Sequence, residues 1–337
     1  MSILITGGAG YIGSHMTHHL VEAGEKIVVL DNLSTGVEKN LPKGITFIRG
    51  DIADQALVSK LIEAHGIDSV IHFAGSVVVP ESVEKPLDYY ANNTSGARNL
   101  IETCVRHGVP NFIFSSTAAV YGSPPVIPVS EEGPTIPLSP YGRSKLMTEW
   151  MLQDIAEAHP IRFGILRYFN VAGADPKGRT GQSTPRATHL IKRACQVATG
   201  QAPHLTIFGT DYDTPDGTGV RDYIHVSDLV DIHHRVLAHL RETSQSLLIN
   251  CGYGRGFSVR EVVATVARIA GQTLPIEEAP RRPGDLASVV ANTAKLSKTL
   301  GWKAKYDDLD TIVTTALNWE MQLKKEMDRA SAGVSAR

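Results

Sequence analysis

The 337-residue sequence predicts an α/β protein with a doubly wound parallel sheet and a second, smaller α/β domain. Three observations support this prediction. Short apolar runs alternate with amphipathic stretches through residue 170. A glycine-rich turn directly follows the first apolar run. Beyond about residue 171 the alternation stops, and segments rich in Gly, Pro, Asp and Thr indicate a different architecture.

The predicted strands are short and rich in β-branched residues. Because strands of a parallel sheet are covered on both faces, they read as continuous apolar runs. Such runs lie at 3–5, 26–30, 46–48, 69–73, 112–114 and 163–166. The amphipathic stretches between them predict helices at 12–23, 55–65, 93–107 and 141–158.

The second half of the chain is more irregular. Residues 172–187 and 200–220 read as loops, and loops of this length in a compact domain are usually functional. The remaining predicted elements are helices at 188–199, 228–242 and 258–270 and a strand at 247–251. We therefore expect a first domain at 1–170 to which 226–250 returns, a second domain formed by 171–225 and 251–322, and a frayed tail at 323–337.

Composition argues against several classes of protein. The formal net charge is -2, so no overall basic field would attract nucleic acid. The apolar runs are too short to span a membrane, and a strand-like segment at 3–5 leaves no room for a signal peptide. The three cysteines lack CxxC spacing, and His15 and His18 have no HExxH setting, so we expect neither disulfides nor a metal site. These features predict a cytoplasmic protein.

The glycine-rich turn has the spacing GxxGxxG, with Gly7, Gly10 and Gly13 between the first strand and the first helix. Such glycines permit a tight turn and a close approach of the backbone to a pyrophosphate, as in the Rossmann fold. Asp31 ends the second strand, where a carboxylate accepts hydrogen bonds from ribose hydroxyls and would repel a 2′-phosphate. We therefore predict NAD rather than NADP. Asp51 would contact the adenine end or, alternatively, cap the following helix.

Tyr141 and Lys145 lie four residues apart at the start of a predicted helix, and so share one helix face. A Tyr with its ordinary pKa of ~10 is a poor base at neutral pH. A neighbouring ammonium group and the positive charge of the nicotinamide would lower this pKa and allow the phenolate to take a proton from a hydroxyl group. Thr117, after the strand at 112–114, can hydrogen-bond the same oxygen. The alternative for Tyr141 and Lys145 is an ordinary surface pair.

Taken together, these motifs resemble the extended short-chain dehydrogenase/reductase family. The resemblance covers about residues 1–320. The matching segments are 7–15, 31–33, 73–75, 89–93, 139–145, 167–170, 219–226 and 281–285. The last two are typical of sugar-nucleotide binding and make the set specific.

The resemblance assigns roles by position. It implies a catalytic group of Thr117, Tyr141 and Lys145. It implies an NAD site formed by Gly7, Gly10, Tyr11, Ile12, Gly13, Asp31, Asn32, Asp51, Ile52, Phe73, Ala74, Gly75, Asn92, Tyr141, Lys145 and Tyr168. It implies a UDP-hexose site formed by Thr117, Asn170, His189, Phe208, Arg221, Tyr223, Arg282, Asp285 and Val289. For Arg221, the alternative is an ion pair with Asp222.

The branch of the family that it resembles acts on the 4-hydroxyl of UDP-hexoses. This implies NAD-dependent interconversion of UDP-glucose and UDP-galactose through a 4-keto intermediate, in a homodimer. Another sugar-nucleotide epimerase, a dehydratase or a decarboxylase is the nearest alternative. Dehydratases and decarboxylases typically carry an acidic residue beside the position of Thr117, whereas this chain has Ala118 and Ala119. A non-enzymatic NAD-sensing regulator would not need the intact catalytic group.

Four positions depart from patterns common in the family. Thr117 replaces a Ser but keeps the hydroxyl, and Val77 replaces a Lys that would contact the cofactor. His189 lies where an Asn-Asn-Leu segment is usual, and can still donate to a phosphate. Val289 lies where others carry Tyr, which leaves room for an N-acetyl group on the hexose. The alternative is that Val289 is a core residue.

Overall fold

The computed structural model describes residues 1–184, 187–282 and 284–334. Its strands are β1 (Ser2–Thr6), β2 (Ile27–Asp31), β3 (Thr46–Arg49), β4 (Ile67–His72), β5 (Asn111–Thr117), β6 (Arg162–Tyr168), β7 (Asn170–Ala172), β8 (Leu205–Phe208), β9 (Val220–His225), β10 (Leu247–Cys251), β11 (Gly256–Ser258), β12 (Ile276–Ala279) and β13 (Ser288–Val289). Its α-helices are α1 (Tyr11–Glu22), α2 (Gln55–His65), α3 (Val79–Glu84), α4 (Pro86–Tyr89), α5 (Gly96–Arg106), α6 (Pro140–Ala158), α7 (Leu190–Ala198), α8 (Val226–Thr243), α9 (Val259–Ala270), α10 (Ala294–Leu300) and α11 (Leu309–Val334). Three short helices, η1 (Glu38–Asn40), η2 (Tyr90–Ser95) and η3 (Ala118–Tyr121), complete the set.

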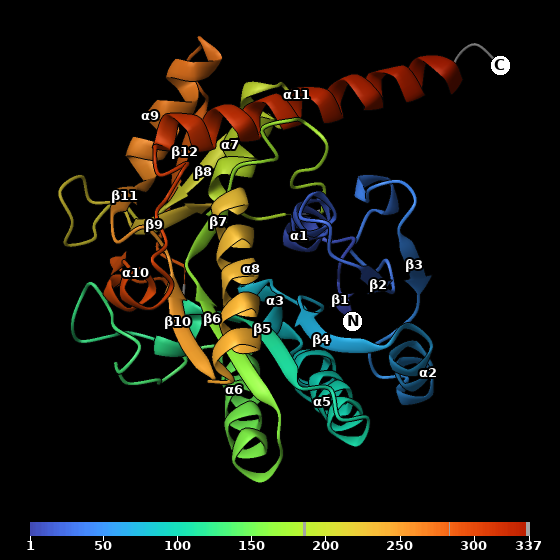
Figure 1. The fold of residues 1–337 in the computed structure, drawn as a ribbon. Coiled ribbons are helices and arrows are strands. Elements are labelled where there is room, and N and C mark those ends of the chain that lie inside the picture. Colours follow the sequence, from blue (N-terminus) through green and yellow to red (C-terminus); the bar gives the residue numbers. More distant parts are fainter. Residues whose placement is uncertain (185–186, 283, 335–337) are drawn as a thin grey trace.

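The centre of the molecule is a seven-stranded parallel sheet with the order β10-β6-β5-β4-β1-β2-β3 (Figure 1). Its strands are apolar on both faces, as the continuous runs predict. Ile3 and Ile5 pack into a core with residues of α1 and α8, whereas Leu4 packs into a second core with residues of α2, α5 and α6. The predicted α/β class with a doubly wound parallel sheet is confirmed.

A smaller body of structure lies beyond the carboxyl edge of this sheet (Figure 1). In it, β9 pairs with β7, β11 and β13, and α7, α9 and α11 share a separate apolar core. The segment 200–220, expected as a loop, contains β8, which pairs in parallel with β12. The short run Leu205–Phe208 becomes a strand because its partner comes from about 70 residues further along the chain.

The final helix also differs from the expectation. Residues 323–334, expected to be frayed, continue α11, which projects beyond the body of the molecule in Figure 1. Lys324 Nζ donates to Thr199 O at 2.7 Å, and Lys39 pairs with Glu326 at 2.5 Å. The polar composition that suggested fraying is also rich in strong helix formers. Residues 335–337 lie outside the described part of the chain.

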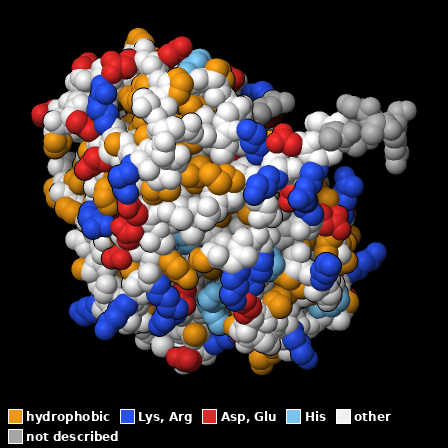
Figure 2. All heavy atoms as spheres, turned by 90° about the horizontal axis from the view of Figure 1, so that it is seen from above, with side chains coloured by type: hydrophobic (Ala, Val, Ile, Leu, Met, Phe, Trp, Pro, Cys, Tyr) orange, Lys and Arg blue, Asp and Glu red, His pale blue; other side chains and the backbone are white. Residues whose placement is uncertain are grey.

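The surface carries charges of both signs. Figure 2 shows basic and acidic side chains interspersed over one face of the molecule. In the described ranges, no helix is long and apolar enough to cross a membrane, and no group of three or more His, Cys, Asp or Glu side chains could hold a metal ion.

Candidate active site

The site lies where the strand order reverses, between β1 and β4. Ligands of doubly wound sheets bind outside the carboxyl ends of the strands at such a point. The backbone amides of Phe73 and Ala74 both donate to Thr6 O, at 2.9 and 3.1 Å. The segment after β4 is thereby held against the glycine turn that follows β1.

The glycine turn is packed too tightly for side chains. Gly7 has φ +70°, and a Cβ atom on it would lie 2.5 Å from Ala74 N. A Cβ atom on Gly13 would lie 2.1 Å from Gly7 O. Among the described residues, no side chain caps the start of α1 at Gly10, so its first-turn amides are available to an anion. The turn therefore fits the pyrophosphate of a dinucleotide.

Asp31 lies at the end of β2, as predicted, and is buried. Its carboxylate accepts hydrogen bonds from Ala9 N at 2.9 Å and Leu33 N at 2.8 Å, which ties the glycine turn to the loop after β2. Asp51 accepts from Asn32 Nδ2 at 2.9 Å. The alternative role of Asp51 as a helix cap does not hold, because Asp54 caps α2. The predicted adenosine side of the site is thus one hydrogen-bonded group.

The predicted catalytic group comes together at the ends of β5 and α6. Ser139 caps α6, its Oγ accepting from Gly142 N at 3.1 Å, and so fixes the turn that carries Tyr141. The Thr117 side chain lies near that of Tyr141 and acts to lower its pKa. Lys145 is 3% exposed, and its ammonium group donates to Ser115 O at 2.9 Å. These contacts exclude the alternative of a surface Tyr/Lys pair.

The protonation behaviour of the pair differs from the expectation. Burial raises the pKa of Tyr141, and the neighbouring Thr117 hydroxyl opposes this increase. Burial also lowers the pKa of Lys145 to about 8. The Lys145 ammonium is directed at Ser115 O and lies 4.9 Å from the centre of the Phe114 ring. The loss of hydration of the phenolate therefore dominates in the protein alone, and an added positive charge is needed to reverse it.

Asn92 was predicted to line the cofactor site, but its neighbour Asn93 was not. Asn92 donates to Ser76 Oγ at 2.9 Å, but Asn93 is the buried residue. Asn93 Oδ1 accepts from Ser76 N at 2.7 Å, and its Nδ2 donates to Ser144 Oγ at 3.0 Å. It thus joins the loop after β4 to α6, which carries the predicted catalytic Tyr141 and Lys145. Both residues lie in η2, a π-helical turn that begins three residues before the helix expected at 93–107; such turns are frequent at functional sites.

Tyr168 lies opposite Thr117 in the pairing of β5 with β6. Its hydroxyl makes a short hydrogen bond with His233 Nε2. His233 Nδ1 lies 2.8 Å from Leu229 O, which can only accept, so Nε2 is the acceptor for the Tyr168 hydroxyl. Burial raises the pKa of Tyr168 well above its ordinary value. No sequence pattern pointed to His233, which lies 65 residues from its partner.

Several of the predicted substrate residues lie on the strands of the smaller body of structure. Arg221 on β9 is paired with Val289 on β13, and Asn170 on β7 with Tyr223 on β9. Val289 packs against the core cluster that also contacts Ala118, next to Thr117 of the predicted catalytic group. Tyr223 is 3% exposed and belongs to an apolar core, so its predicted contact with the substrate stays a prediction.

The Arg-rich part of the predicted substrate site is more open. Arg282 lies over the Phe208 ring at 4.8 Å, and its Nε donates to Asp285 at 2.8 Å. The alternative ion pair between Arg221 and Asp222 is not formed. Arg221 donates to Val220 O, while Asp222 accepts from the amides of Tyr253 and Gly254.

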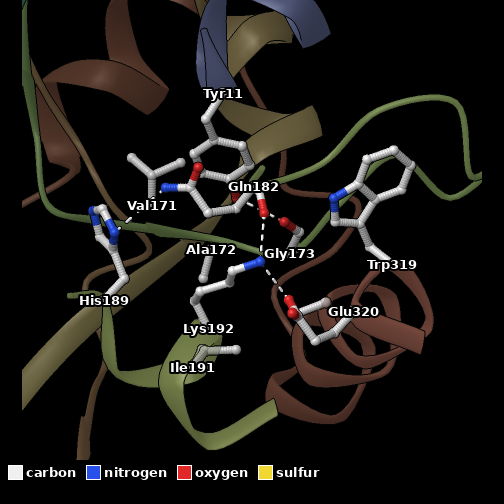
Figure 3. A pocket seen from close by; sticks show the side chains of 11 residues that line it. Tyr11, Val171, Ala172, Gly173, Gln182, His189, Ile191, Lys192, Trp319 and Glu320 are labelled. Atoms are coloured by element: carbon white, nitrogen blue, oxygen red, sulfur yellow. Dashed lines mark hydrogen bonds and ion pairs between the residues drawn. The ribbon is translucent and has the colours of Figure 1, made fainter. Parts of the chain in front are cut away.

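A small cavity of about 30 Å³ lies between the start of α1 and helices α7 and α11 (Figure 3). Tyr11 lines it and donates to Gly173 O at 2.6 Å. His189 lines the other side, with its Nδ1 3.4 Å from Gln182 Nε2. His189 therefore lies near Tyr11 of the predicted cofactor site. Val77, which replaces a Lys that would contact the cofactor, has 49% of its surface exposed.

Comparison with known proteins agrees with this geometry. Residues 3–252 match the model of the NAD dependent epimerase/dehydratase family. The chain belongs to this family. This NAD dependent epimerase/dehydratase is 56% identical, over 98% of its length and 95% of the relative's, to a UDP-glucose 4-epimerase of Azospirillum brasilense. The resemblance stated from the motifs is thereby confirmed.

Solved structures of family members have the same fold. One is a UDP-glucose 4-epimerase from Bifidobacterium longum in complex with NAD+ and UDP, with a TM-score of 0.90 and 39% identity, covering 96% of this chain and 98% of that one. Another is a UDP-Glc/GlcNAc 4-epimerase from Campylobacter jejuni, with a TM-score of 0.83 and 46% identity, covering 95% and 99%.

Proposed function

We propose that the protein interconverts UDP-glucose and UDP-galactose, using an NAD that stays bound. The observation that carries this proposal is the grouping of Tyr141 with Thr117 and the buried Lys145 at the reversal of strand order. The 56% identity to a UDP-glucose 4-epimerase supports the choice of substrate. Conversion of UDP-galactose by the purified protein tests it.

The catalytic residues divide the work as follows. Tyr141 takes the proton of the sugar 4-hydroxyl, and Thr117 holds the reacting oxygen. When bound, NAD supplies the acceptor for the hydride that leaves C4 of the sugar. Its positive nicotinamide ring opposes the effect of burial on the pKa of Tyr141. Arg221 and Arg282 would hold the diphosphate, since guanidinium groups suit such anions. Because binding energy then rests on the nucleotide, the hexose is free to turn between its two orientations.

Two other functions make different predictions. A dehydratase or decarboxylase needs an acid or base for elimination, but Ala118 and Ala119 follow Thr117. A regulator that only senses NAD would convert no sugar. Analysis of the products from UDP-galactose distinguishes all three, because only epimerisation yields UDP-glucose.

We expect the purified protein to carry NAD without any being added. A cofactor that is reduced and reoxidised in each cycle has no need to leave, and Asp31 would disfavour a 2′-phosphate. Acid denaturation followed by enzymatic assay of the supernatant measures the bound nucleotide. Recovery of NADP alone, or of no nicotinamide nucleotide, would contradict the role given to Asp31.

We also expect some conversion of N-acetylated UDP-hexoses. Val289 is smaller than the Tyr of other family members and packs against the same core cluster as Ala118, so it leaves space at the sugar C2 substituent. Comparison of kcat/KM for UDP-galactose and UDP-N-acetylgalactosamine measures this tolerance. Val289→Tyr should lower only the second value. An undetectable reaction of the wild type with the acetylated sugar would show that other residues close the space.

We further propose that the protein is a cytoplasmic homodimer. Its three cysteines are free and buried, which suits a reducing compartment. Helices α3 and α4 pack against α6, and this part of the surface exposes Val83, Leu87, Met147 and Trp150. A large exposed apolar patch usually marks an interface. Sedimentation equilibrium should give the mass of two chains, and Trp150→Lys should give the mass of one.

A further inference from the structure

Glu149 lies on the same face of α6 as the catalytic pair. Tyr141, Lys145 and Glu149 are spaced four residues apart, so they form one stripe along the helix. Glu149 is fully buried at 0% exposure, although carboxylates are almost never buried without a specific partner. The burial of Glu149 must therefore be explained by its partners.

The contacts of Glu149 join three elements. Its carboxylate accepts from Arg167 Nη2 at 2.6 Å and from Arg167 Nε at 3.1 and 3.2 Å. It also accepts a short hydrogen bond from Ser116 Oγ. Arg167 lies on β6 and Ser116 on β5, so this one carboxylate ties α6 to both strands.

The two partners lie directly beside the catalytic residues. Ser116 and Arg167 are opposite each other in the pairing of β5 with β6. The next opposite pair is Thr117 and Tyr168. Glu149 is therefore attached to β5 one residue before Thr117. Tyr141 lies two helical turns before Glu149 on α6, near Thr117.

Arg167 is itself held from the other side. Its Nη1 donates to Tyr121 OH at 3.0 Å and to Glu131 O at 3.2 Å, and its guanidinium lies over the Tyr121 ring at 4.8 Å. Tyr121 OH in turn donates to Asn250 Oδ1 at 2.6 Å. A buried network with its donors satisfied in this way rigidifies the structure around it.

We infer that Glu149 is a positioning residue for the proton transfer, because it sets the distance between Tyr141 on α6 and Thr117 on β5. This inference rests on the proposed function. Thr117 opposes the effect of burial on the pKa of Tyr141, so a shift of α6 away from β5 weakens that opposition. Loss of the Glu149 charge therefore affects both the geometry and the titration of the base.

The test compares Glu149→Gln with the wild type, using NAD-loaded enzyme well below both melting temperatures. We expect kcat for UDP-galactose to fall on the order of 10- to 100-fold, as small misplacements of reacting groups do, with KM changed less than about twofold. The rise of kcat with pH should also move to higher pH, because the pKa of Tyr141 increases. A purely structural role would leave that pH profile in place.

Asp228→Asn is the matched control. Asp228 is 1% exposed and accepts from Tyr253 OH at 2.7 Å, but it lies on α8, on the other face of the sheet. This variant should lower the melting temperature and leave kcat unchanged. If Glu149→Gln does not fold, Ser116→Ala replaces it, since it removes one hydrogen bond to Glu149 and leaves the ion pair. Unchanged kcat and pH profile in the folded variant would overturn the inference, whereas an inactive wild type would overturn the proposed function.

Discussion

Tyr141→Phe should lower kcat for UDP-galactose by at least about 100-fold and leave nucleotide binding nearly unchanged. The phenolic oxygen is the group that exchanges the proton, and a positioned general base usually contributes on the order of 10²-fold or more. The affinity for the UDP-hexose comes mostly from its nucleotide part, which the Tyr141 side chain does not hold. Initial rates and UDP titration by calorimetry measure the two effects separately.

Tyr306→Phe is the control for this substitution, because its ring stacks on His225 and takes no part in the catalytic group. It should leave kcat unchanged. If Tyr141→Phe kept more than about a tenth of the wild-type kcat, Tyr141 would not be the base.

Gly13→Ala should remove most of the bound NAD and lower the melting temperature. The added Cβ atom would lie 2.1 Å from Gly7 O and 2.7 Å from Gly8 Cα, so backbone atoms of the turn must move. Overpacking of this kind typically costs about 1–3 kcal/mol and here distorts the pyrophosphate cradle itself. The nucleotide released by acid, relative to protein, measures the loss.

Gly164→Ala distinguishes a local effect on the turn from general destabilisation. Its added Cβ atom would lie 2.4 Å from Val236 Cγ1, a side-chain atom in the core of the sheet. This variant should lower the melting temperature yet retain NAD. Equal loss of NAD from both variants would show that NAD depends on overall stability and not on the shape of the turn.

Features set by neighbouring residues could be predicted from the sequence. The parallel strands follow from apolar runs that are buried on both faces, and the glycine turn follows from spacing alone. Tyr141 and Lys145 share a helix face because they are four residues apart. Each of these features depends on residues that are close together in the sequence.

Features set by distant contacts could not be predicted. Strand β8 depends on its pairing with β12, and the Tyr168–His233 hydrogen bond joins residues 65 positions apart. The direction of the change in the pKa of Tyr141 depends on how deeply the folded chain buries the ring. Glu149 belongs to no sequence motif. Its contacts form only because the pairing of β5 with β6 brings Ser116 and Arg167 together.

The central claim is that this chain epimerises a UDP-hexose with a cofactor that it already holds. The most direct measurement is incubation of the purified protein with UDP-galactose and no added NAD, followed by separation of the nucleotide sugars. We predict a mixture of UDP-glucose and UDP-galactose that is the same from either starting sugar. Recovery of unchanged UDP-galactose from protein shown to contain NAD, or formation of a dehydrated product, would contradict the claim.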